Sequence, residues 1–285
     1  MQFRRVVVAV DGSPTSLAAL EATAELASAW GAEVVGLFVE DTNLLRMASL
    51  PFAREVGSHS GAHRAINPDQ FEREFRSQSD RARNTLWYVA ERFRLTASFQ
   101  VSRGPVTTEL LKALGDADML SMGKGGRSVT ASLGLGTNAR AVVAAKRGIV
   151  LLFSHVASVS GPPAVVYDGS PTGDKALRAA SELARTLGTS LRVLCPVEIE
   201  LGKEEIEEKA TKAAADQQTA LEFRRILIRN VADLARTVRS SGANVAVVPT
   251  TSPVLPLAAI ETLLSRFSGP IMLVGDGSDS EDTSR

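Results

Sequence analysis

Short apolar runs alternate along the chain with longer stretches in which apolar residues recur every three or four positions. Near the start, the runs VVVAV and AEVVGLFV flank residues 14–30, where Leu17, Leu20 and Ala24 fall on one helical face. Short apolar runs bounded by turn residues are typical of buried parallel strands. The pattern therefore predicts a strand–helix–strand unit with a right-handed crossover.

The same pattern returns in the second half of the chain. Residues 11–31 align without a gap with residues 168–188, and 12 of these 21 positions are identical. The Ser/Gly/Pro-rich stretch HVASVSGPP separates the halves. We therefore expect two tandem open parallel-sheet, Rossmann-like α/β sandwich domains at 1–156 and 161–276. The acidic residues 277–285 are expected to form a disordered tail.

The later elements of the two halves correspond as well. Predicted strands at 117–123 and 148–154 and a long helix at 67–94 have counterparts at 242–250, 269–275 and 204–223, respectively. The segment after the second strand, residues 41–69, is harder to interpret. It holds an apolar patch and a Gly/Ser/His loop, and it could form a short helix and a lid over the strand ends, a dimer contact or a mobile loop.

Composition excludes several classes of protein. Lys and Arg together number 32, as do Asp and Glu, so the basic excess typical of nucleic-acid binding is missing. The apolar runs are much shorter than the roughly 18 residues of a membrane span, and the first run is too short for a signal peptide. The single cysteine, Cys195, cannot form an intrachain disulfide. We therefore expect a cytoplasmic protein with no membrane or nucleic-acid partner.

Candidate chemistry gathers in GKGGRSVTASLGLGTN, residues 123–138, which follow a predicted strand. Ligands of open parallel sheets bind outside the carboxyl ends of the strands, where residues 11–13 and 39–41 are also expected. Glycine lets the backbone approach an anion, and a helix capped by Thr137 or Asn138 would present free N–H groups to phosphate. Lys124 and Arg127 are expected to add positive charge there.

The spacing Gly123-x2-Gly126-x9-Gly136-Thr137-Asn138, together with VVVAVDGSPTS, resembles the ATP-binding signature of the universal stress protein family. The resemblance covers nearly the whole chain as two tandem copies, and it implies an adenine nucleotide alpha hydrolase-like fold. In ATP-binding members of the family, the counterparts of Asp11 and Val39 lie beside adenine and ribose. The counterparts of Met122 and Gly123 line the nucleoside. Four further counterparts surround the phosphates, namely those of Gly126, Gly136, Thr137 and Asn138.

The resemblance further implies Mg²⁺ bound with ATP, without a separate metal site made by protein residues alone. The complete predicted site adds Gly12 and Ser13 of the first turn to these residues. Lys124 and Arg127 occupy variable positions of the signature, so their assignment to phosphate is our own inference. No residue is predicted to be catalytic.

The second half departs from the signature. Asp168-Gly169-Ser170 repeats the first turn, but Pro249 stands where Gly123 stood, and the next glycine is Gly269. Proline removes an N–H donor that a phosphate would need. We therefore predict one nucleotide per chain, bound by the first half.

Competing motifs are weak. A GxGxxA match at 134–139 lacks the strand that should directly precede it, and no Walker A sequence occurs. His59 and His63 have the spacing of a helical metal pair, but the glycines beside them favour a surface loop. Asp11 can also be interpreted as a residue that only stabilises its turn and caps the helix.

Three functions remain open at this point. The first is an ATP-binding regulatory protein of the stress response that acts on an unknown protein partner. The alternatives are a slow ATPase and a nucleotide-independent scaffold. Domains of the family commonly dimerise through the last strand. The halves could thus pair within one chain as a pseudo-dimer, or the chain could form a homodimer through residues 41–66.

Overall fold

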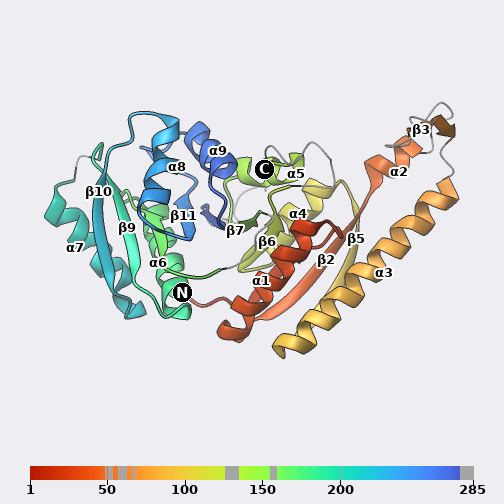
Figure 1. Ribbon diagram of the computed structural model, residues 1–285, viewed down its shortest axis with the longest axis horizontal. Helices are drawn as coiled ribbons and strands as arrows, with labels where there is room; N and C mark the ends of the chain where they lie inside the picture. Colours follow the sequence, from red (N-terminus) through yellow and green to blue (C-terminus); the bar gives the residue numbers. More distant parts are fainter. Residues whose placement is uncertain are drawn as a thin grey trace, which may run out of the picture.

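The computed structural model describes residues 1–48, 50, 54–56, 63–65, 68–125, 135–154, 159–199 and 201–276. Ten strands form one continuous sheet, with helices on both faces (Figure 1). The predicted α/β fold with a mostly parallel sheet is therefore confirmed. None of the helices in these ranges is long and apolar enough to cross a membrane.

The first half contributes five parallel strands in the order β5-β2-β1-β6-β7. Their bounds are β1 (Arg5–Ala9), β2 (Glu33–Asp41), β5 (Ala97–Gly104), β6 (Met119–Gly123) and β7 (Ile149–Phe153). The second half repeats this order as β10-β9-β8-β11-β12. Its strands are β8 (Pro163–Val166), β9 (Leu191–Pro196), β10 (Leu221–Ile226), β11 (Val245–Pro249) and β12 (Ile271–Val274). The sequence repeat is thus also a repeat of topology.

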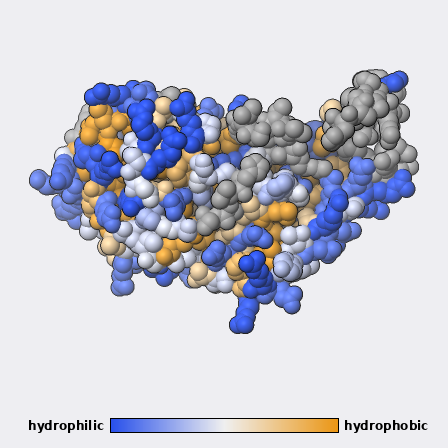
Figure 2. All heavy atoms as spheres, viewed as in Figure 1, coloured by the Kyte–Doolittle hydropathy of each residue, from blue (hydrophilic) through white to orange (hydrophobic). Residues whose placement is uncertain are grey.

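Each face of the sheet carries its own hydrophobic core. One core is shared with helices α1 (Pro14–Trp30), α3 (Pro68–Phe93), α6 (Pro171–Thr186) and α7 (Lys203–Ala214). The opposite core is shared with α4 (Val106–Gly115), α5 (Thr137–Ala144), α8 (Val231–Ser240) and α9 (Leu257–Arg266). Hydrophilic side chains cover α3 and α7 at the two ends of the molecule (Figure 2). These helices therefore bury only one face, as amphipathic helices over a sheet do.

The two halves meet at their last strands. β7 and β12 pair antiparallel, with Ile149 opposite Val274 and Leu152 opposite Ile271. Trp30 at the end of α1 also donates from Nε1 to the Thr186 hydroxyl of α6 at 2.8 Å. Of the two arrangements left open by the sequence, the structure has pairing within one chain. A homodimer through residues 41–66 stays a prediction.

The described residues between 41 and 65 form a short helix, as one interpretation expected, and then two strands of a small hairpin. The helix is α2 (Thr42–Ala48), and the antiparallel hairpin consists of β3 (Arg54–Val56) and β4 (His63–Ala65). Together with the start of α3, they project away from the ten-stranded sheet in Figure 1.

One predicted helix was wrong in its extent. The helix expected over 204–223 ends at Ala214, a 3₁₀ turn follows, and residues 221–226 form the edge strand β10. Gln218 has a φ of 49°, which breaks the helix before the strand begins. The alternating exposure along β10 is typical of an edge strand, and its first residues were mistaken for the end of the helix. Residues 155–158, within the predicted domain boundary, and the predicted tail 277–285 lie outside the described ranges.

Candidate functional site

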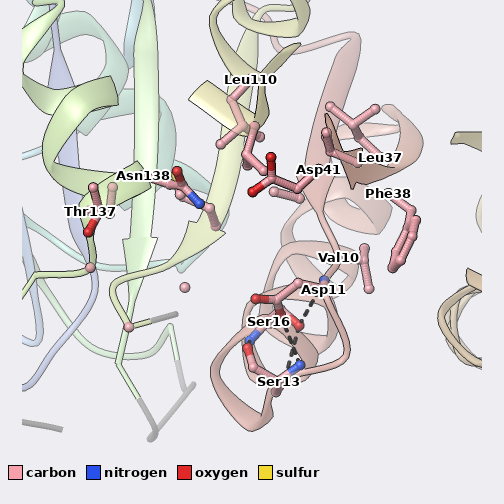
Figure 3. A pocket seen from close by; sticks show the side chains of 18 of the residues that line it. Val10, Asp11, Ser13, Ser16, Leu37, Phe38, Asp41, Leu110, Thr137 and Asn138 are labelled. Atoms are coloured by element: carbon pink, nitrogen blue, oxygen red, sulfur yellow. Dashed lines mark hydrogen bonds between the residues drawn. The ribbon is translucent and has the colours of Figure 1, made fainter. Parts of the chain in front are cut away.

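A cavity of about 250 Å³ opens at the carboxyl end of the first-half sheet (Figure 3). The ends of β1, β2 and β6 form its floor, and the first turns of α4 and α5 contribute to its walls. Leu44 of α2 and Phe75 of α3 complete the lining. Eight of the predicted site residues line this cavity: Asp11, Ser13, Val39, Met122, Gly123, Gly136, Thr137 and Asn138.

The turn after β1 fixes Asp11 at the cavity. Asp11 Oδ1 accepts a hydrogen bond from the Ser13 amide at 2.9 Å, and Gly12 has a φ of 77° that suits glycine. Ser13, rather than Asp11, is the N-cap of α1, because its hydroxyl accepts from the Ser16 amide at 3.2 Å. Gly12 itself is not among the lining residues, so its role is to shape the turn.

The end of β2 supplies an apolar wall and a second carboxylate. Val39 and Phe38 line the cavity together with Asp41, whose Oδ1 accepts from the Asn43 amide at 2.9 Å. In Figure 3 the side chains of Asp41 and Asn138 extend toward each other from opposite walls. Asp41 was missing from the predicted site, although the rule that placed residues 39–41 at a strand end could have found it.

Met122 and Gly123 end β6 beside the start of α1. A Cβ atom on Gly123 would lie 2.7 Å from Thr15 Oγ1 and 3.1 Å from the Thr15 carbonyl carbon. The Thr15 hydroxyl also donates to the Gly125 carbonyl at 3.4 Å. Gly123 is therefore required here by close packing against α1, whatever its relation to a ligand.

The other end of the glycine stretch begins α5. The predicted cap, Thr137 or Asn138, was wrong, because Gly136 is the N-cap and Thr137 is the first helical residue. The Gly136 amide donates to the Lys124 carbonyl at 2.8 Å, so it is not free for a phosphate. The first helical hydrogen bond runs from the Arg140 amide to the Gly136 carbonyl at 2.9 Å. The amides of Thr137 and Asn138 lie N-terminal to that bond and have no carbonyl acceptor within the helix.

Lys124 does not place its charge in the cavity, contrary to the expectation from sequence. Its ammonium group donates to the Phe267 carbonyl at 2.9 Å and to the Gly269 carbonyl at 3.0 Å, both in the second half. The side chain is 6% exposed, and burial lowers the pKa of the amine to about 8. The role predicted for Lys124 as a phosphate ligand is therefore corrected.

Some predicted residues lie outside the described part of the chain. Gly126 and Arg127 are among them, as is His59 of the histidine pair. Within the part that is described, the cavity lining contains the carboxylates of Asp11 and Asp41 and has no lysine or arginine. Across those same ranges, no group of three or more His, Cys, Asp or Glu is placed to hold a metal ion.

The corresponding turn of the second half is packed against side chains of its own half. Tyr167, in the position of Val10, is fully buried, and its hydroxyl donates to Asp174 Oδ1 at 2.6 Å. Leu201 and Ile206 lie over Gly169, and the Lys209 ammonium donates to its carbonyl. The N-cap of α9 is Pro256, which has no N–H group.

Both the sequence and the fold are similar to those of known proteins. The model of the universal stress protein family matches residues 2–151. A universal stress protein from Archaeoglobus fulgidus DSM 4304 superposes with a TM-score of 0.73 at 18% identity, covering 98% of each chain. A functionally unknown protein from Pseudomonas aeruginosa PAO1 follows with a TM-score of 0.55 at 12% identity, covering 95% of this chain and 92% of the other. A search of the curated proteins found no match.

Proposed function

Since the chain belongs to the universal stress protein family, we propose that its first half binds ATP with Mg²⁺ and that the protein is a nucleotide-responsive regulatory protein. The observation that carries the proposal is the cavity at the carboxyl ends of β1, β2 and β6. Ligand sites of open parallel sheets form at this edge, and the predicted signature residues converge on it from separate parts of the sequence.

The cavity suits the nucleoside part of the ligand. Its volume of about 250 Å³ lies near the lower end of small-molecule sites, so the phosphates would extend beyond it. Val39 and Leu110 offer apolar surface to a purine ring. Asp11 and Asp41 offer carboxylate oxygens, which accept hydrogen bonds from an amino group or from ribose hydroxyls.

The first turn of α5 suits the phosphates. Thr137 and Asn138 line the cavity at the start of α5, their amides have no acceptor within the helix, and the helix dipole adds partial positive charge there. The two lining carboxylates would repel a polyphosphate, and Mg²⁺ that enters with the ligand would offset that repulsion. The chain therefore supplies backbone donors at this point, and the metal ion would arrive with the ligand.

Binding is proposed in place of catalysis because the two carboxylates among the described lining residues, Asp11 and Asp41, are assigned to the nucleoside. That assignment leaves no evident general base for water beside the phosphates. Slow hydrolysis of ATP and a nucleotide-independent scaffold are the alternatives that the experiment must separate.

A pair of matched substitutions tests the proposal. Val39→Trp fills the cavity, whereas Val197→Trp places the same side chain at an exposed position directly after β9, the matching strand of the second half. We expect calorimetric titration with Mg²⁺-ATP to show binding by the wild type and by Val197→Trp. Val39→Trp should bind at least about tenfold more weakly, which equals about 1.4 kcal/mol.

Two results would count against the proposal. If the wild type shows no heat of binding and no gain in thermal stability at millimolar Mg²⁺-ATP, the scaffold is favoured. If ATP is turned over many times and Val39→Trp abolishes the turnover, the protein is an ATPase.

A further inference from the structure

The turn between α9 and β12 is bound by side chains of the other half. Lys124 donates to the carbonyls of Phe267 and Gly269, and the Ser154 hydroxyl donates to the carbonyl of Ser268 between them. Lys124 directly follows β6, and Ser154 directly follows β7. Three consecutive carbonyls of the second half are therefore held by the strand ends of the first.

Lys124 also lies where both ends of the glycine stretch meet. Its neighbours Gly123 and Gly125 line the cavity. Its carbonyl accepts the Gly136 amide at 2.8 Å, and its own amide donates to the Phe153 carbonyl of β7 at 2.6 Å. One residue thus joins the end of β6, the start of α5 and the junction between the halves.

The fold does not require this link, because the second half is built without it. Thr250 corresponds to Lys124, since its amide donates to the Val274 carbonyl at 2.8 Å as Lys124 does to Phe153. The Thr250 hydroxyl turns back to that same carbonyl at 3.3 Å and does not reach across to the first half. The side-chain link of Lys124 therefore has no counterpart at Thr250. The reciprocal turn of the first half is held by backbone hydrogen bonds instead, from the Gly275 amide to the Gly148 carbonyl at 2.7 Å and from the Asp276 amide to the Lys146 carbonyl at 3.1 Å.

The cost of burying Lys124 argues for a specific role. Lysine is seldom fully buried without a charged partner, and the acceptors that its ammonium group contacts are two neutral carbonyls. Burial of the amine is expensive, as its lowered pKa of about 8 indicates. A shorter polar residue such as Thr250 avoids that cost but cannot span the junction.

We propose that Lys124 is a positioning residue through which the α9–β12 turn of the second half holds the cavity in its binding-competent form. The inference rests on the proposed nucleotide binding. Lys124 is not one of the residues that line the cavity. It is bonded to two residues that do, by the peptide bond to Gly125 and by the hydrogen bond from the Gly136 amide, so it acts through them. If the turn stabilises the binding form, a bound nucleotide must stabilise the turn by the same free energy.

The test compares Lys124→Met with two controls. Lys112→Met removes an exposed lysine of α4, and Ser154→Ala removes the neighbouring hydrogen bond to the Ser268 carbonyl but leaves both Lys124 hydrogen bonds to the turn in place. We expect Lys124→Met to bind Mg²⁺-ATP at least about tenfold more weakly, and both controls to bind within about twofold of wild type. A purely structural role would lower the unfolding temperature and leave the affinity of the folded protein unchanged.

If Lys124→Met does not fold, hydrogen exchange of the wild-type protein with and without Mg²⁺-ATP tests the same proposal. We expect Mg²⁺-ATP to slow exchange in peptides covering residues 263–272. Slower hydrogen exchange in these peptides, together with a loss of Mg²⁺-ATP affinity in folded Lys124→Met, supports the link between the turn and the cavity. Binding by the wild type without slowing, or unchanged affinity in folded Lys124→Met, overturns the link alone. Absence of binding by the wild type overturns the proposed function together with it.

Discussion

The turns after β1 and β8 are nearly identical, yet only one of them borders the cavity described here. Asp11 and Asp168 each accept from a serine amide at 2.9 Å, and the glycines that follow them have φ values of 77° and 75°. Ser13 and Ser170 each cap the following helix. The DGS turn is therefore a requirement of the fold, and it does not by itself indicate a ligand site.

The difference arises from the residues that surround these turns. Val10 lines the cavity, whereas Tyr167 at the matching position is fully buried and donates to Asp174 Oδ1. A Cβ atom on Gly169 would contact Leu201, Ile206 and Lys209, whereas one on Gly12 would meet no described atom within 4 Å. The two halves therefore share the turn and differ in the side chains that pack around it.

The largest effect on stability is expected at Tyr167. Tyr167→Val removes a fully buried ring and leaves Asp174 without the hydroxyl that donates to it, so unfolding should become easier by about 3–5 kcal/mol. Val10→Ala in the first half removes only two methyl groups beside an existing cavity and should cost about 1–2 kcal/mol. Urea denaturation measures both. Equal losses would show that the two positions are equally filled.

A pH-dependent effect follows from Lys124. The folded protein lowers the pKa of this amine from 10.5 to about 8, so the unfolded chain binds more protons between these two pH values. Wild-type stability should therefore rise with pH across that window relative to Lys124→Met, by about 3 kcal/mol in total. Denaturation of both proteins at several pH values measures the difference, in which other titrating groups cancel. A flat difference from pH 8 to 10.5 would mean that the amine is not buried as described.

The smallest effects are expected at the two helix caps. Ser13→Ala and Ser170→Ala each remove a cap hydrogen bond and should each cost about 1 kcal/mol of stability. Only Ser13 lines the cavity, so only Ser13→Ala should weaken binding of Mg²⁺-ATP. Parallel denaturation and titration of the two variants check this. Weaker binding in Ser170→Ala would place the second half in the site.

Much of the fold could be predicted because its signals are local or repeated. The strands at 119–123 and 149–153 are short apolar runs, and the repeat predicted equivalent elements in the second half. Strand β10 could not be separated from the helix before it, because a charge-rich helix continues into a polar edge strand. The turn at Gln218 between them has no strong sequence signal.

The site was predictable where position along a strand determines it. Asp11, Val39 and Gly123 lie at strand ends, and all three line the cavity. Lys124 was interpreted wrongly because a lysine beside glycines resembles a phosphate ligand in sequence. Its true acceptors lie 143 and 145 residues away and are brought near by the antiparallel pairing of β7 and β12. A sequence pattern around Lys124 alone cannot indicate a pairing between strands so far apart in the chain.

The central claim is that nucleotide binds to the first half alone, and the stoichiometry of Mg²⁺-ATP binding tests it most directly. Calorimetric titration of the intact chain should give one site per molecule, which Val39→Trp weakens and Val197→Trp leaves intact. Two equivalent sites per chain, or one site that Val39→Trp does not affect, would contradict the account.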